Sequence, residues 1–126
     1  MKLIIAGSRN VNSLALVRLC FKQFKYCDKI ESVISGCARG VDRLGEEVAK
    51  ENRLIIISKP ANWDLHGKSA GYKRNSEMAE IADCLLAIWD KRSRGTKHMI
   101  DTALKKGIYV EVYDNFGRRL DIKEYE

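Results

Sequence analysis

Short apolar runs alternate along this chain with longer segments in which apolar residues recur every three or four positions. Strands are predicted from the short runs at 2–6, 30–34, 54–57, 84–89 and 108–113. Helices are predicted from the longer segments at 14–26, 41–52, 72–82 and 95–106. Because strands and helices take turns along the chain, the pattern is typical of an α/β domain built around a parallel sheet.

The order of these elements predicts a single Rossmann-like domain over 1–126, with a core at 1–113 and a charged C-terminal tail at 114–126. Right-handed crossovers lead to a five-stranded parallel sheet of order 3-2-1-4-5 with helices on both faces. The third strand is almost entirely apolar, so we expect it to be buried on both faces. Pro60 opens a predicted polar loop that extends to about Gly71.

The composition is that of an ordinary globular protein, with 45% hydrophobic and 32% charged residues. No apolar run approaches the roughly 20 residues that cross a bilayer, and the N-terminus lacks the apolar region of a signal peptide. We therefore expect a cytoplasmic protein without a membrane partner. The four cysteines form no Cys-x-x-Cys pair, so we expect reduced thiols, no metal site and no cofactor.

A net charge of +6 at pH 7 indicates an anionic partner. Two clusters of cations are expected, each beside the end of a predicted strand. The first cluster is Lys68, Lys73 and Arg74, and the second is Lys91, Arg92, Arg94, Lys97 and His98.

Glycine, a small hydroxyl residue and arginine follow three of the predicted strands. The segments are Gly7-Ser8-Arg9, Ser35-Gly36-Cys37-Ala38-Arg39-Gly40 and Asp90-Lys91-Arg92-Ser93-Arg94-Gly95-Thr96. Glycine in these segments has two possible roles: it permits a tight turn, or it lets the backbone approach a ligand closely. In the second case, the free amides at the start of the following helix and the arginine side chain favour a phosphate group. Because the carboxyl ends of parallel strands share one edge of a sheet, the second alternative predicts one phosphate-binding site. No segment matches the patterns of P-loop triphosphatases or NAD dehydrogenases.

The order and spacing of these motifs resemble the SLOG superfamily, and more narrowly its YspA/YpsA-related branch of small proteins often encoded by phages and other mobile elements. The matching motifs, over about 1–113, are Gly7-Ser8-Arg9, Ser35-Gly-x-Ala-Arg-Gly-Val-Asp42, Pro60-Ala-x-Trp63, Gly67-Lys68, Ala70-Gly71-x-x-Arg74-Asn75-x-x-Met78, Ala82-Asp83, Trp89-Asp90 and Gly95-Thr96-x-x-Met99-Ile100. Relatives include the Lonely Guy phosphoribohydrolases, the single-strand-binding DprA proteins and nucleotide-signal sensors. The resemblance implies a Rossmann-like pocket for a nucleotide or a nucleotide derivative.

The resemblance to the Lonely Guy enzymes leaves catalysis open. Arg74 and Met78 match their Arg-x-x-x-Met element, which implies that Arg74 contacts phosphate or a sugar hydroxyl. Their catalytic glutamate is replaced by Met99, whose thioether can neither stabilise positive charge on a ribose nor activate water. If the protein is an enzyme, the catalytic candidates are Arg74 and a relocated carboxylate, with Asp42 first and Glu46, Asp90 and Asp101 as the alternatives.

The predicted function is binding of a phosphorylated nucleotide or nucleotide-derived signal, of the ADP-ribose or cyclic-nucleotide type, by a homo-oligomer that senses or sequesters it. One version is a phage-encoded sponge of immune signals. The alternatives are a nucleotide N-glycosidase or phosphoesterase, and a protein that binds single-stranded nucleic acid. The predicted ligand-binding residues are Gly7, Ser8, Arg9, Ser35, Gly36, Ala38, Arg39, Gly40, Asp42, Lys68, Arg74, Asn75, Trp89, Asp90, Ser93, Arg94, Gly95 and Thr96. Trp63, Trp89 and Tyr72 are the candidates for stacking on a base.

Overall fold

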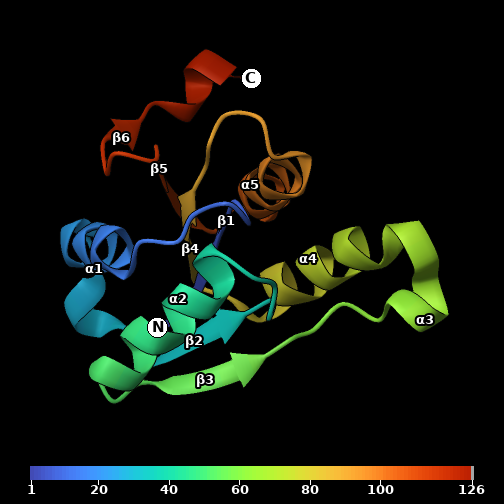
Figure 1. Ribbon diagram of the computed structural model, residues 1–126, viewed down its shortest axis with the longest axis horizontal. Helices are drawn as coiled ribbons and strands as arrows, with labels where there is room; N and C mark the ends of the chain where they lie inside the picture. Colours follow the sequence, from blue (N-terminus) through green and yellow to red (C-terminus); the bar gives the residue numbers. More distant parts are fainter. Residues whose placement is uncertain (126) are drawn as a thin grey trace.

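Figure 1 shows the computed structural model of the chain, which describes residues 1–125. The strands are β1 (Lys2–Gly7), β2 (Ser32–Ser35), β3 (Ile55–Ser58), β4 (Cys84–Ile88), β5 (Tyr109–Tyr113) and β6 (Arg119–Leu120). The α-helices are α1 (Leu14–Gln23), α2 (Val41–Glu51), α3 (Trp63–His66), α4 (Ala70–Ile81) and α5 (Arg94–Lys106). Short 3₁₀ helices, η1 to η3, cover Cys27–Lys29, Gly67–Ser69 and Ile122–Tyr125.

All strands belong to one sheet of order β3-β2-β1-β4-β5-β6. The first five strands are parallel and have the predicted order, so the Rossmann-like α/β class is confirmed. The prediction of five strands is wrong, because the charged tail returns as β6 and pairs antiparallel with β5. Asp114 Oδ1 organises this return by accepting hydrogen bonds from the amides of Phe116 and Arg118 at 2.8 and 3.0 Å. The sequence pattern did not predict β6, because a strand of two residues is too short for an alternation of apolar and polar positions to be recognised.

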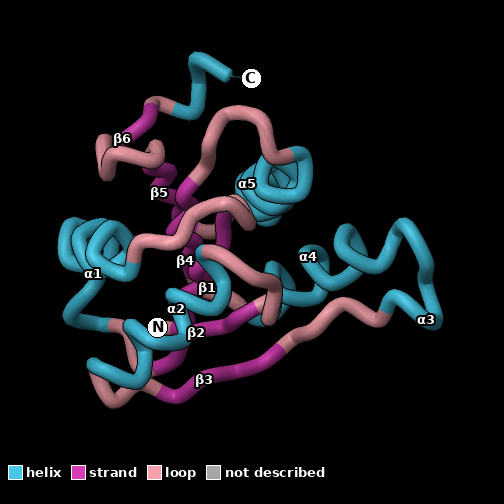
Figure 2. The backbone as a smooth tube through the Cα atoms, in the orientation of Figure 1, coloured by secondary structure: helices cyan, strands magenta, loops and turns pink. Residues whose placement is uncertain are grey.

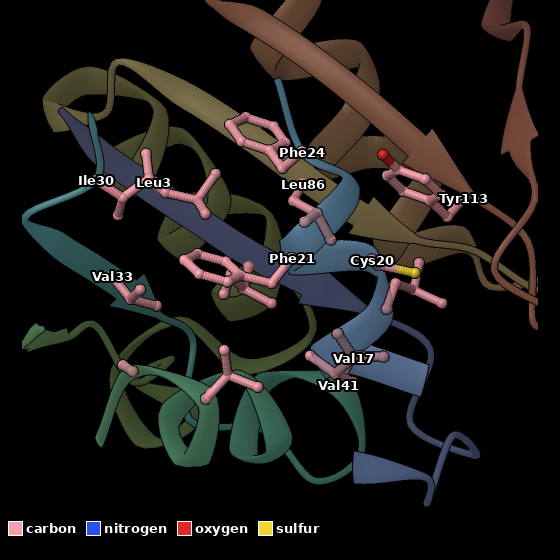
Figure 3. Packing of buried hydrophobic residues seen from close by; sticks show 14 of the residues in the cluster. Leu3, Val17, Cys20, Phe21, Phe24, Ile30, Val33, Val41, Leu86 and Tyr113 are labelled. Carbon is pink, nitrogen blue, oxygen red and sulfur yellow. The ribbon is translucent and has the colours of Figure 1, made fainter. Parts of the chain in front are cut away.

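The sheet separates two apolar layers, because successive side chains of a strand point to opposite faces. Leu3 and Ile5 of β1 pack with α1 and α2, and Figure 3 shows the centre of this layer. Ile4 and Ala6 of the same strand pack with α4 and α5. In Figure 2 the strands, in magenta, run between these two pairs of helices. None of the helices described over residues 1–125 is long and apolar enough to cross a membrane.

The third strand is less buried than its apolar sequence predicts. Because β3 lies at the edge of the sheet, it has a neighbouring strand on one side only. Ile55 is 67% exposed, whereas Ile56 packs against the layer that contains α2. The expectation that this strand is buried on both faces is therefore wrong, since its place in the strand order decides its burial.

Two predicted boundaries also change. The predicted loop from Pro60 to Gly71 contains α3, which begins where Asn62 Oδ1 accepts a hydrogen bond from the Leu65 amide at 3.1 Å. The helix predicted over 14–26 ends at Gln23, and the chain enters β2 through η1. The first change moves Trp63 from an irregular loop onto a short helix beside the carboxyl edge of the sheet.

A buried carboxylate ties β5 to its neighbours. Glu111 is 1% exposed and accepts hydrogen bonds from the hydroxyls of Tyr109 and Tyr113 at 2.7 and 2.5 Å. It also accepts a hydrogen bond from the Lys25 amide at 2.9 Å and pairs with Arg119 at 3.3 Å. Burial acts to raise the pKa of Glu111, but these hydrogen bonds and the Arg119 charge outweigh it and hold the pKa below its ordinary value.

We expect Glu111→Gln to lower the free energy of unfolding by about 2–4 kcal/mol at pH 7, because the amide leaves buried donors and Arg119 without their partner. Since the folded state lowers the pKa of Glu111, its contribution is present above the ordinary value of 4.5 and is lost as the pH falls further. Urea unfolding at pH 7 and pH 4 measures both effects. Glu77→Gln, at an exposed helix position, is the control, and equal stability of the two variants at pH 7 would contradict the expectation.

Candidate functional site

A cleft of about 500 Å³ opens at the carboxyl ends of β1, β2 and β4. The loops after these three strands form one side of it, and α4 and the start of α5 form the other. The strand order reverses at β1, which pairs with both β2 and β4. Ligands of open α/β sheets bind at this type of reversal, so the cleft is the first candidate for a functional site.

Two glycines allow close backbone approaches at the cleft, Gly40 between the loops after β2 and β1, and Gly7 between the ends of β1 and β4. Gly40 has φ +78°, and a Cβ atom there would lie 2.5 Å from the carbonyl oxygen of Ser8. A Cβ atom on Gly7 would lie 2.3 Å from the carbonyl oxygen of Ile88. These backbone approaches exclude larger residues. They also bring Arg9 and Arg39 to the same cleft from different loops.

Arg74 reaches the cleft from α4 and crosses to the loop after β2. Its Nη1 donates a hydrogen bond to the carbonyl oxygen of Gly36, and its Nε donates one to Asn75 Oδ1 at 3.0 Å. A Cβ atom on Gly36 would lie 2.5 Å from Arg74 Nη1 and 2.7 Å from Asp42 Oδ2. Burial lowers the pKa of Arg74, and the nearby Asp42 opposes this effect. Glycine at position 36 is therefore a condition for placing this guanidinium.

The amide of Asn75 ties α4 to the start of α5. Asn75 is 5% exposed, and its Nδ2 donates a hydrogen bond to the Gly95 carbonyl oxygen at 3.2 Å and lies 3.2 Å from His98 Nδ1. Tyr72 stacks on the His98 ring with the centroids 4.2 Å apart. Burial lowers the pKa of His98, which favours its neutral form. The neutral ring thus supports Tyr72 at the cleft.

Asp90 shapes the loop between β4 and α5. Its Oδ1 accepts hydrogen bonds from the amides of Arg92 and Ser93 at 2.8 and 2.7 Å. Burial acts to raise the pKa of Asp90, but the hydrogen bonds from Ser93, Arg92 and Ser8 outweigh it and the pKa falls below its ordinary value. Ser93 caps α5 through the Thr96 amide. The positive end of the α5 dipole therefore lies at the cleft, where Ser93 and Thr96 are lining residues.

Asp42 is a buried carboxylate in the same cleft. It stands in the first turn of α2, is 5% exposed, and accepts a hydrogen bond from the Ala38 amide through Oδ2 at 3.2 Å. Desolvation raises its pKa to about 6, although the Ala38 amide and the charge of Arg74 act in the opposite direction. At this pKa the group can both hold and release a proton near neutral pH.

A second hollow of about 410 Å³ adjoins the cleft. Its own lining includes Pro60 and Cys37, and it shares Arg9, Arg39 and Arg74 with the main cleft. The three guanidinium groups therefore stand where the two spaces meet. Trp63, which is 52% exposed, also borders both spaces.

The comparisons with known proteins found a phage protein that is similar to this chain. No family model matches it. It is 38% identical over 91 residues to the Gene 61 protein of Mycobacterium phage D29, in an alignment that covers 68% of this chain and 70% of the phage protein. The chain belongs to the family of this phage protein. The name of the Gene 61 protein states no activity.

Most of the residues predicted from the sequence lie at the cleft of this Gene 61 family member. Those that line it are Gly7, Arg9, Ala38, Arg39, Asp42, Lys68, Arg74, Asn75, Asp90, Ser93, Gly95 and Thr96. Gly36 lines the adjoining hollow. The cations of this set come from four separate segments of the chain, which only the fold brings together.

Five of the predicted residues lie outside the linings of both spaces: Ser8, Ser35, Gly40, Trp89 and Arg94. The hydroxyls of Ser8 and Ser35 are buried, and they accept hydrogen bonds from the amides of Asp90 and Cys37 at 3.1 Å each. Trp89 is 5% exposed, and its indole N–H donates to the Ser93 carbonyl oxygen at 3.0 Å. These side chains support the loops. Trp89 is not available for stacking on a base in the cleft, because it is part of the core.

The structure separates the four candidate carboxylates. Asp42 and Asp90 line the cleft, whereas Glu46 accepts a hydrogen bond from Ser35 at 2.6 Å and Asp101 is exposed and paired with Lys97 at 2.6 Å. Met99 lines the cleft as an apolar group. Within residues 1–125, no group of three or more His, Cys, Asp or Glu side chains is arranged to hold a metal ion.

Some lining residues are missing from the predicted ligand-binding set. Asn10 and Ala6 line the cleft beside the predicted Gly7-Ser8-Arg9 segment, and Met78 and Met99 form part of its apolar wall. Tyr72 also lines the cleft, and it lies on α4 two positions before Arg74. The resemblance to the Arg-x-x-x-Met element marked Met78, but no local signal marks Asn10.

The raised pKa of Asp42 makes its charge unfavourable for folding. The unfolded chain releases this proton around the ordinary value of 3.8 and the folded chain around 6, so stability falls as the pH rises between these values. We expect Asp42→Asn to raise the free energy of unfolding at pH 7.5 by about 1–3 kcal/mol and to lose this advantage near pH 4.

Thermal unfolding of both proteins at several pH values measures the effect. Asp64→Asn, at an exposed position of α3, is the matched control and is expected to change stability by less than about 0.5 kcal/mol. A loss of stability in Asp42→Asn that grows as the pH rises would instead show that the charged carboxylate stabilises the fold.

Proposed function

We propose that this protein binds a phosphorylated nucleotide or nucleotide-derived signal in the cleft, for sensing or sequestration. The observation that carries the proposal is the convergence of Arg9, Arg39 and Arg74 from three separate segments onto one hollow at the strand ends. Guanidinium groups match the oxygens of phosphate in pairs, and the dipole of α5 adds a favourable field for an anion.

The rest of the lining suits a nucleoside. Trp63 and Tyr72 are 52% and 46% exposed and stand at the cleft, where a base could stack on either ring. Met78 and Met99 supply apolar surface further in. The adjoining hollow leaves space for a second group beyond the arginines. This shape favours a ligand with a phosphate between two larger parts, such as ADP-ribose or a cyclic dinucleotide.

We also infer that the Gene 61 family falls within the SLOG superfamily. This inference is supported by the positions of the residues in the motifs that resemble SLOG proteins. Gly36, Asp42 and Arg74 are among them, and these residues contact one another or line one cleft. The phage relative agrees with a version in which the protein sequesters a nucleotide signal of host defence. Sequestration requires tight binding and an intact ligand, and both can be measured.

The first test identifies what the purified protein retains and what it binds. We expect mass spectrometry of heat-released small molecules to find a nucleotide, and calorimetry with AMP, ADP-ribose and cyclic dinucleotides to find micromolar or tighter binding for at least one. Arg39→Ala is expected to weaken that binding by about 10-fold to 100-fold through the loss of a charge-assisted contact with phosphate.

Arg92→Ala is the matched control, because Arg92 is exposed in a neighbouring loop and does not line the cleft. If both variants lose the same affinity, the effect comes from the net charge of the protein and not from a contact between Arg39 and phosphate. Binding of long single strands that exceeds mononucleotide binding and collapses with salt would replace the proposal with nucleic-acid binding.

Asp42 supports a second candidate function, hydrolysis of a nucleotide at its N-glycosidic bond. The carboxylate lies in the cleft beside Arg74, and its pKa of about 6 suits a group that activates water. Asp90 is less suited, because backbone amides already occupy its Oδ1 and hold it ionised.

Incubation with AMP and chromatography for free adenine separates the two candidates. Binding without cleavage is the expected result for a sensor or a sequestering protein. Release of adenine that disappears in Asp42→Asn, while Asp64→Asn releases it at the normal rate, would establish the hydrolase instead.

A further inference from the structure

A cleft lined by four cations contains one buried carboxylate that no described cation pairs with. Arg9, Arg39, Lys68 and Arg74 all line the cleft, yet Asp42 forms no ion pair within residues 1–125. The guanidinium of Arg74 is instead held by the Gly36 carbonyl oxygen and by Asn75. A carboxylate that served only to orient Arg74 would be expected to contact it directly.

The acceptor capacity of Asp42 is only partly used. An ionised carboxylate can accept about four hydrogen bonds, whereas Asp42 accepts one from the Ala38 amide at 3.2 Å and is also stabilised by the amide of Gly7. The neighbouring carboxylate on α2 is engaged, because Glu46 accepts hydrogen bonds from Ser35 and Arg43 at 2.6 and 3.3 Å. Asp42 therefore has free acceptor sites at the wall of the cleft, whereas Glu46 faces protein groups.

Asp42 and Arg74 both reach the space beside the same glycine. Both Arg74 Nη1 and Asp42 Oδ2 come within 2.7 Å of the position that a Cβ atom of Gly36 would occupy. A nucleotide combines an anionic phosphate with ribose hydroxyls, which are neutral donors a few bonds away in the same molecule. A carboxylate repels phosphate but accepts hydrogen bonds from hydroxyls, so Asp42 and the arginines suit different parts of one molecule.

We propose that Asp42 accepts hydrogen bonds from the ribose hydroxyls of the ligand, and that the cleft thereby selects ribonucleotides over 2′-deoxyribonucleotides. This inference rests on the proposed nucleotide binding. At pH 7.5 the carboxylate is mainly ionised because its pKa is about 6, so both of its oxygens are acceptors. A site built to bind a hydroxyl discriminates strongly against an analogue that lacks it, because the buried acceptor is then left unpaired.

The test compares AMP with 2′-deoxy-AMP, and ADP-ribose with its 2′-deoxy counterpart, by calorimetry at pH 7.5. We expect the wild-type protein to bind the ribose form of at least one pair about 10-fold or more tightly than the deoxy form. Asp42→Asn is expected to weaken binding of the ribose form and to leave binding of the deoxy form unchanged or tighter. Asp64→Asn is the matched control and should keep the preference.

The outcomes separate this inference from the function on which it rests. If no probe binds the wild-type protein, the proposed nucleotide binding fails, and the inference fails with it. If ribose and deoxy forms bind equally well, only the role of Asp42 is overturned. An equal loss for both forms in a folded Asp42→Asn protein, checked by thermal unfolding, would mean that Asp42 maintains the shape of the cleft. A variant that keeps the preference but no longer releases adenine would make Asp42 a catalytic residue instead.

Discussion

The contact between the Arg74 guanidinium and the Gly36 backbone holds the two sides of the cleft together. Arg74 comes from α4 and Gly36 from the loop after β2, so this hydrogen bond joins segments separated by 38 residues. It requires a residue without a side chain at position 36, because a Cβ atom would collide with the guanidinium. Through Asn75 the same arginine is linked to the start of α5. The three elements around the cleft therefore depend on one cation and one glycine.

The two carboxylates of the cleft show how environment divides the roles of identical groups. Asp90 is ionised and satisfied by backbone amides, which makes it a structural element of the loop before α5. Asp42 is desolvated and has one direct amide partner, so its charge opposes folding at neutral pH. Residues that reduce stability are common where a protein binds or transforms a ligand. This contrast is the physical reason to assign ligand chemistry to Asp42 and not to Asp90.

The Gene 61 family uses a widespread architecture, and such folds support many chemistries. The features that narrow the choice are in the lining. Met99 presents an apolar surface near the start of α5, and the cations stand where the cleft meets the adjoining hollow. These features together favour holding an anion with apolar parts. Asp42 is then the group whose role distinguishes a protein that only binds a nucleotide from one that hydrolyses it.

The hydrophobic pattern alone determined the alternation of strands and helices, and the connection rules then led to the order of the parallel strands. Local motifs also identified most of the cleft, since glycine and arginine after a strand have direct consequences for backbone geometry and charge. Burial could not be predicted in the same way, and Ile55 and Trp89 illustrate why. Ile55 is apolar but lies on an edge strand, and Trp89 follows a strand but packs inward.

Only the tertiary structure decided which carboxylate matters. Asp42, Glu46, Asp90 and Asp101 all follow a strand or belong to a helix near the motifs, and their sequence contexts do not rank them. The pairing of Asp101 with Lys97 and the hydrogen bonds of Asp90 with the amides of Arg92 and Ser93 are local. The pairing of Glu46 with Ser35 and the burial of Asp42 instead depend on segments that meet only after folding. Composition and spacing determine which side chains are available, whereas burial and partners, set by the packing of distant segments, determine which one remains free to meet a ligand.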